Sequence, residues 1–91
     1  MERCEVTVSW AAIAFVNAAG HDATVVGSPE VENSACTELL GINTCYWVII
    51  VEAKPNSSGL FLDRRLLIST KQMGASAGCT VLSVEDVTDS E

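Results

Sequence analysis

The stretch of this 91-residue sequence that decides the fold is TCYWVIIVE, at residues 44–52. Every side chain from 45 to 51 is apolar, so a strand built from this stretch has two apolar faces. Such a strand lies in the centre of a sheet with both faces covered, or at an interface with a second copy of the chain. Tyr46 and Trp47 are neighbours and must point to opposite faces. We expect one in the core and the other to be a candidate contact residue.

The residues that follow this stretch predict a hairpin. A turn-rich loop occupies 54–59, and 60–70 returns as a second strand. The Asp-Arg-Arg run at 63–65 interrupts the apolar pattern of this strand, which indicates a bulge or an edge position. Arg64 and Arg65 therefore also count as candidate contact residues, one on each face.

The N-terminal segment alternates between apolar and polar residues over 4–10, which predicts a half-buried strand. Its apolar side consists of Cys4, Val6, Val8 and Trp10. The wholly apolar segment 11–16 is expected to continue the strand. Residues 17–22 then read as a hairpin connection to another strand at 23–27.

The next segment carries the start and stop signals of a helix over 29–40. Ser28 can cap the free amides, Pro29 suits the first helical position, and Glu30 meets the positive end of the helix dipole. Gly41 can end the helix in a left-handed conformation. One predicted helical face is apolar and consists of Val31, Ala35, Cys36, Leu39 and Leu40.

These elements, with a last strand at 80–87, predict an α+β fold. We expect one mostly antiparallel sheet of about five strands with the 29–40 helix packed on one face, and an all-β sandwich as the alternative. A chain of this length forms one domain, 1–91, which buries roughly 63% of its unfolded surface. The acidic segment 85–91 is expected to be a frayed tail.

Four cysteines, Cys4, Cys36, Cys45 and Cys79, form an even set without the close spacing of a zinc or redox motif. Two disulfides in an exported protein suit so small a domain, because crosslinks add most where the core is small. Buried thiols in a cytosolic protein are the alternative. All three pairings stay open. A bond from Cys4 on the first strand to Cys36 on the helix, which leaves Cys45 with Cys79, is favoured on geometry.

Composition excludes several classes of function. The net charge is −7 with only five basic residues, which argues against nucleic acid as a partner. No apolar run approaches the ~20 residues of a membrane span. His21 is the single histidine and falls in a predicted turn, and no nucleotide, metal or hydrolase motif is present. We therefore expect no enzyme, no cofactor and no metal.

Two functional hypotheses remain. The first is a small secreted protein, stapled by disulfides, that binds another protein as effectors, toxins and inhibitors do. Its first residues do not resemble a signal peptide, so we expect an exported form to have lost its leader. Asn56 begins an Asn-Ser-Ser glycosylation pattern in the predicted loop. The second hypothesis is an acidic cytoplasmic interaction protein with reduced cysteines, such as a phage-type inhibitor or an assembly subunit. A homodimer is compatible with either.

Overall fold

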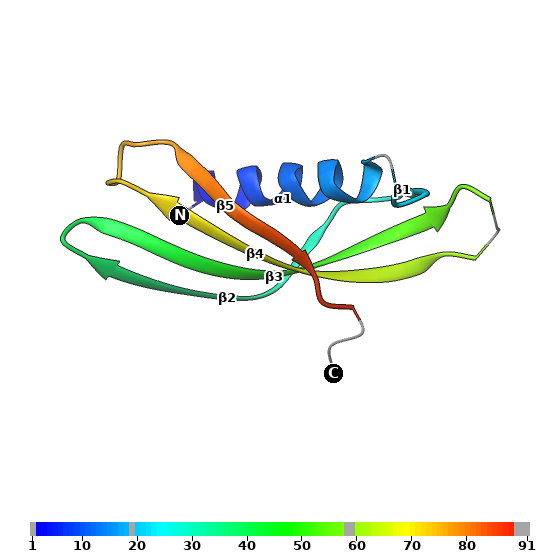
Figure 1. The fold of residues 1–91 in the computed structure, drawn as a ribbon. Coiled ribbons are helices and arrows are strands. Elements are labelled where there is room, and N and C mark those ends of the chain that lie inside the picture. The colour runs from blue at the N-terminus through cyan, green and yellow to red at the C-terminus, as the bar shows by residue number, and fades with distance from the viewer. Residues whose placement is uncertain (1, 19, 58–59, 89–91) are drawn as a thin grey trace.

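One helix packs across one face of a curled antiparallel sheet in the computed structural model, which describes residues 2–18, 20–57 and 60–88 (Figure 1). The elements are α1 (Glu2–Asn17), β1 (Ala23–Val25), β2 (Glu30–Leu39), β3 (Ile42–Pro55), β4 (Leu62–Gln72) and β5 (Cys79–Asp86). β3 pairs with β4 along one side, and with both β2 and β1 along the other. The predicted α+β class, with five strands and one helix on one face, is confirmed.

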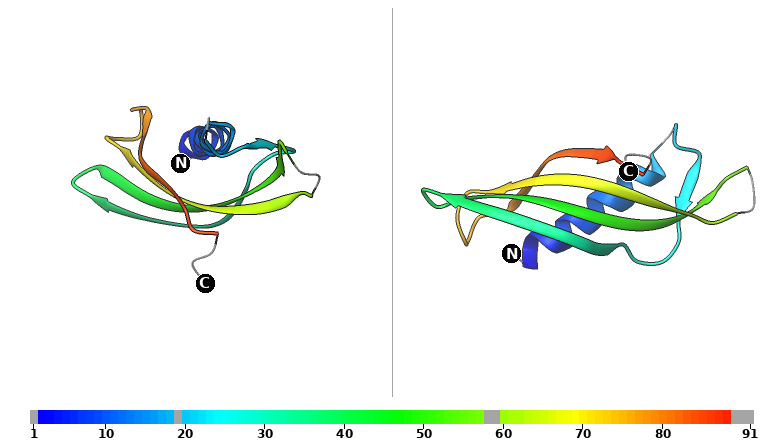
Figure 2. Two further views of the ribbon diagram at one scale, coloured as in Figure 1. Left: turned by 45° about the vertical axis from the view of Figure 1, so that its right-hand side comes forward. Right: turned by 90° about the horizontal axis from the view of Figure 1, so that it is seen from below.

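The long hairpin of β3 and β4 is the centre of the sheet, as predicted. Their register places Trp47 opposite Ile68 and Ile49 opposite Leu66, and all four side chains are buried beneath α1. Even-numbered side chains of β3 point to the other face, which no helix covers (Figure 2). The register runs without a shift past Arg64 and Arg65, so no bulge lies there. Pairing with β5 begins only at Leu66, so this segment does occupy an edge.

The predicted strand at 4–10, with its continuation over 11–16, is wrong, because these residues form α1. The buried side of the helix repeats every four residues and consists of Cys4, Val8, Ala12 and Val16. A spacing of four satisfies the two-residue period of a strand as well as one face of a helix. Val6 and Trp10 distinguish the two, since a strand would bury them and α1 leaves them 60% and 67% exposed. Three alanines in the next turns favour the helix.

The predicted helix at 29–40 is also wrong, because this segment is the edge strand β2. Only Val31 is partly buried in this strand, so most of the apolar residues of the predicted helical face stay outside the core. Hydrogen bonds to β3 hold the segment instead. Gly41 adopts the expected positive φ, but it does so with Leu40 in the two-residue turn between β2 and β3 (φ 56° and 81°). Two successive positive φ angles are the mark of a type I′ hairpin turn.

The remaining boundaries shift by a few residues. The strand predicted at 23–27 is shortened to β1, and it follows a helix rather than a hairpin partner. β5 begins one residue earlier than predicted. Glu85 and Asp86, which the expected tail also included, are the last two residues of β5, and residues 89–91 fall outside the described part of the chain.

Candidate interaction surfaces

All four cysteines form disulfides, in a pairing different from the favoured one. Cys4 bonds to Cys79, and Cys36 bonds to Cys45. The expectation failed because it placed Cys4 on a strand and Cys36 on a helix. In the fold, Cys4 lies on the first turns of α1 against the start of β5, with Cα atoms 5.2 Å apart. Cys36 and Cys45 face each other across β2 and β3, with Cα atoms 4.1 Å apart.

The two bonds fasten different parts of the fold. Cys4–Cys79 joins α1 to the outer strand β5, across a sequence separation of 75. Cys36–Cys45 joins the exposed strand β2 to the central strand β3, across a separation of 9. Because no cysteine is free, none supplies a thiolate for nucleophilic chemistry.

The two arginines point to opposite faces, as predicted, and each makes an ion pair within the chain. Arg64 binds the Asp86 carboxylate, with Nε 3.1 Å from Oδ2. Arg65 binds Glu32, with Nε 3.2 Å from Oε1. These contacts anchor the end of β5 and the start of β2 to β4. Both guanidinium groups therefore have structural partners at the sheet edge.

Asp86 is held in its charged form by its neighbours. Burial by itself raises the pKa of this carboxyl, but the Thr88 hydroxyl and amide donate hydrogen bonds to it, and Arg64 adds another with its positive charge. Together these contacts lower the pKa of Asp86 below its ordinary value. The same Thr88 hydroxyl accepts a hydrogen bond from the Arg65 amide (3.0 Å), which ties the end of the described chain to β4.

Tyr46 and Trp47 separate as the sequence predicts. The Trp47 indole is buried under α1, and its Nε1 donates to the Thr70 hydroxyl at 3.0 Å. Tyr46 is 55% exposed on the opposite face of the sheet. Trp47 is consequently a core residue, and only Tyr46 is available to another molecule.

Asn56 and His21 belong to two turns that meet at one end of the sheet, where the Asn56 amide donates a hydrogen bond to the carbonyl of Asp22 at 2.9 Å. Asn56 is exposed, and its side-chain oxygen accepts a hydrogen bond from Thr24 at 2.8 Å. Glycosylation of Asn56 stays a prediction, and Ser58, the third residue of its pattern, lies outside the described residues. His21 is exposed and packs its ring against Phe15, with ring centroids 4.6 Å apart.

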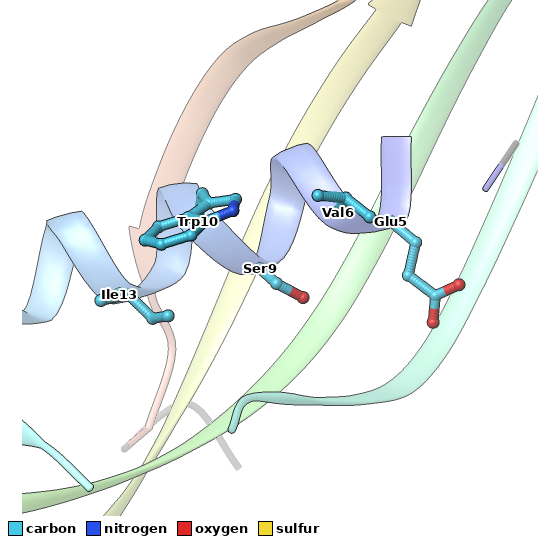
Figure 3. A pocket seen from close by; sticks show the side chains of 5 residues that line it. All are labelled: Glu5, Val6, Ser9, Trp10 and Ile13. Atoms are coloured by element: carbon cyan, nitrogen blue, oxygen red, sulfur yellow. The ribbon is translucent and has the colours of Figure 1, made fainter. Parts of the chain in front are cut away.

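Sequence reasoning missed a second apolar stripe, on the outer side of α1. Val6, Trp10 and Ile13, which we call the helix stripe, follow one another at spacings of four and three residues. With Glu5 and Ser9 they line a shallow groove of about 400 Å³ (Figure 3). The spacing was visible in the sequence, but it has meaning only once the segment is known to be a helix.

No helix in the described ranges is long and apolar enough to cross a membrane. Among the same residues, no group of three or more His, Cys, Asp or Glu side chains is arranged to hold a metal ion. No protein-family model matches the chain, and no significantly similar curated protein or solved structure was found.

Proposed function

We propose that this chain is a secreted, disulfide-stabilised protein that acts by binding another protein through the helix stripe. The observation that carries the proposal is Trp10, a large aromatic side chain left 67% exposed at the middle of α1. Interface energy concentrates in such aromatic side chains, which fill a pocket on the partner. Val6 and Ile13 extend the apolar contact by one turn on either side.

The rigid mounting of the stripe supports this role. The disulfide from Cys4 to Cys79 holds the first turns of α1 against the sheet. The opposite side of the helix is buried, with Val8 and Ala12 wholly enclosed. A side chain presented on a fixed helix loses little conformational freedom on binding, which favours affinity.

Charge indicates the chemistry of the partner. The chain has twelve acidic and five basic residues, and two of the basic ones, Arg64 and Arg65, are in internal ion pairs. Glu5 lines the groove beside the stripe. We expect a partner surface with an apolar pocket bordered by Lys or Arg, since complementary potentials accelerate association.

The pair of disulfides supports an oxidising compartment, because the cytosol keeps most thiols reduced. The alternative of an acidic cytoplasmic protein with reduced cysteines has less support. Intact mass before and after reduction tests this part of the proposal. Protein from its native source should be lighter by four hydrogens before reduction, and four alkylated thiols would contradict export.

Binding is tested by immobilising the oxidised chain and its W10A variant on a resin. Each resin is then exposed to the extracellular fluid of the source organism. L40A is the matched control, because Leu40 is 92% exposed in the turn between β2 and β3, outside the helix stripe. We expect a protein retained by the wild type and L40A and lost with W10A, with weaker retention at high salt. Equal retention by all three proteins would refute the role of the stripe.

A further inference from the structure

We propose that a second copy of this chain docks on the sheet face opposite α1. This surface, which we call the open face, has an apolar centre made by Ala35 on β2, Tyr46, Val48 and Ile50 on β3, and Leu67 on β4. No helix covers it, and Figure 2 shows the strands in front when the molecule is seen from that side. The open face and the helix stripe lie on opposite sides of the molecule, so the two proposals are independent.

The centre of the open face can lose its water at low cost. Val48, Ile50 and Leu67 are half-buried already, and Tyr46 is exposed. The neighbouring hydroxyls of Ser69 and Ser83 are 2.6 Å apart and satisfy each other. Beside Ile50 stand two charged side chains, Glu30 on the edge strand β2 and Arg65 on β4, and Arg65 is paired with Glu32. Burial of unpaired charges is what makes polar interfaces expensive, so the second copy has to leave the exposed Glu30 in water. Glu85, opposite Leu67 on the outer strand β5, stands at the exposed rim.

The available area favours this face over the helix for self-association. The paired part of β3 and β4 is about 35 Å long, and four strand positions are about 19 Å wide, which gives roughly 650 Å² in projection. Counted for both copies, this projection lies near the lower end of the ~1,200–2,000 Å² of a specific interface. It is an upper bound, because the sheet curls around α1 and the open face is convex (Figure 1). The outer side of α1 is only about 24 Å by 10 Å, which is too small.

Charge at the two ends of the open face sets the orientation of the second copy. At one end Glu52 and Asp63 are directly opposite each other on neighbouring strands. Like charges in this position repel, and neither carboxylate makes an ion pair with any residue that the structure describes. At the other end Lys71 lies opposite Thr44. One copy thus presents an acidic end and a basic end.

The register makes these ends symmetric about one residue pair. The Val48–Leu67 pair is four residues from Glu52 and Asp63, and four residues from Thr44 and Lys71. A two-fold axis that passes beside this pair, perpendicular to the strands, brings Lys71 of each copy over the acidic pair of the other. The charged ends of the contact are then self-complementary, as a two-fold interface requires, and the result is a sandwich of two sheets about 10 Å apart. Glu85 lies in the same row as the Val48–Leu67 pair, so the axis brings it toward its counterpart in the second copy at the exposed rim, where salt screens their repulsion.

Sedimentation equilibrium of the oxidised chain from about 1 to about 200 μM tests the proposal. We expect a monomer–dimer equilibrium that K71E weakens by about tenfold or more. K54E is the matched control, because Lys54 is on the same strand face beyond the acidic end and the variant has the same net charge. The K71E/D63K double variant should recover much of the lost affinity, because it restores opposite charges across the axis.

A second comparison tests the open face without relying on the pairing between its charged ends. Y46E places a charge on the open face, and V6E places one on the helix stripe at a similarly exposed position. We expect Y46E to be monomeric and V6E to dimerise like the wild type, with circular dichroism showing both folded. A wild type that stays monomeric at every concentration overturns the proposal. So does a dimer that V6E disrupts and Y46E leaves intact.

Discussion

The two disulfides should contribute unequally to stability, and the difference can be worked from the fold. A crosslink restricts the unfolded chain, and in the chain-entropy treatment this restriction grows with the logarithm of the loop it closes. For the separation of 75 between Cys4 and Cys79 the treatment gives about 4.5 kcal/mol. For the separation of 9 between Cys36 and Cys45 it gives about 2.6 kcal/mol.

The perturbation is a pair of double variants, C4A/C79A and C36A/C45A. Each removes one fully buried sulfur, from Cys4 or from Cys45, so the packing losses are similar and largely cancel in the comparison. The first variant should be less stable than the second by about 2 kcal/mol. For 91 residues this corresponds to a midpoint of thermal unfolding lower by about 10 °C.

Urea and thermal unfolding followed by circular dichroism measure both quantities. Reduction with dithiothreitol is the control, because the difference between the two variants should shrink once the remaining bond is opened. Equal midpoints for the two oxidised variants would refute the loop-entropy reasoning. A larger loss for C36A/C45A would mean instead that β2 depends on its disulfide for its place in the sheet.

Three further predictions concern single side chains. D86N should reduce the loss of stability at acid pH. The pKa of Asp86 is lowered in the fold, so its contribution to the free energy of unfolding is present above the unfolded pKa near 3.9 and is lost as the pH falls through the folded pKa. Urea unfolding from pH 7 to pH 2 measures this loss. W47F should cost about 1–3 kcal/mol in urea unfolding, because the buried Thr70 hydroxyl loses its donor, whereas W10F should change stability by less than about 0.5 kcal/mol. L40N should raise the unfolding midpoint by the equivalent of about 0.5–1 kcal/mol, since Asn-Gly is the preferred type I′ turn and exposed Leu40 loses no burial; a lower midpoint would contradict the turn assignment.

Local sequence patterns predicted the structure correctly where the hydrophobic period and the length of the segment both indicated the same element. The run at 44–52 and the turn residues after it predict the central hairpin of β3 and β4, and the structure confirms it. The same reasoning separates Tyr46 from Trp47, because neighbours on a strand always face opposite ways. The α+β class and the approximate strand number are also confirmed, although the segment expected to be the helix is β2 and the segment expected to be the first strand is α1.

The wrong predictions concern segments whose sequence is compatible with both a strand and a helix. Cys4 and Val8 fit a strand and a helix equally, and only packing against the sheet decides between them. The Ser-Pro-Glu start at 28–30 has the residues of a helix cap, yet the segment pairs with β3 from Glu30 to Leu39, and this tertiary pairing overrides the local helix signal. The helix stripe was hidden for the same reason, since Trp10 counts as exposed only on a helix.

By itself, the sequence determined a small acidic α+β domain with a two-faced central strand and four cysteines able to crosslink it. Tertiary structure decided which segment is the helix, which cysteines meet, and which apolar side chains stay outside. The physical reason is that a strand or helix pattern is read over neighbouring residues. The bond between Cys4 and Cys79 and the opposition of Glu52 and Asp63 depend on distances set by the whole sheet.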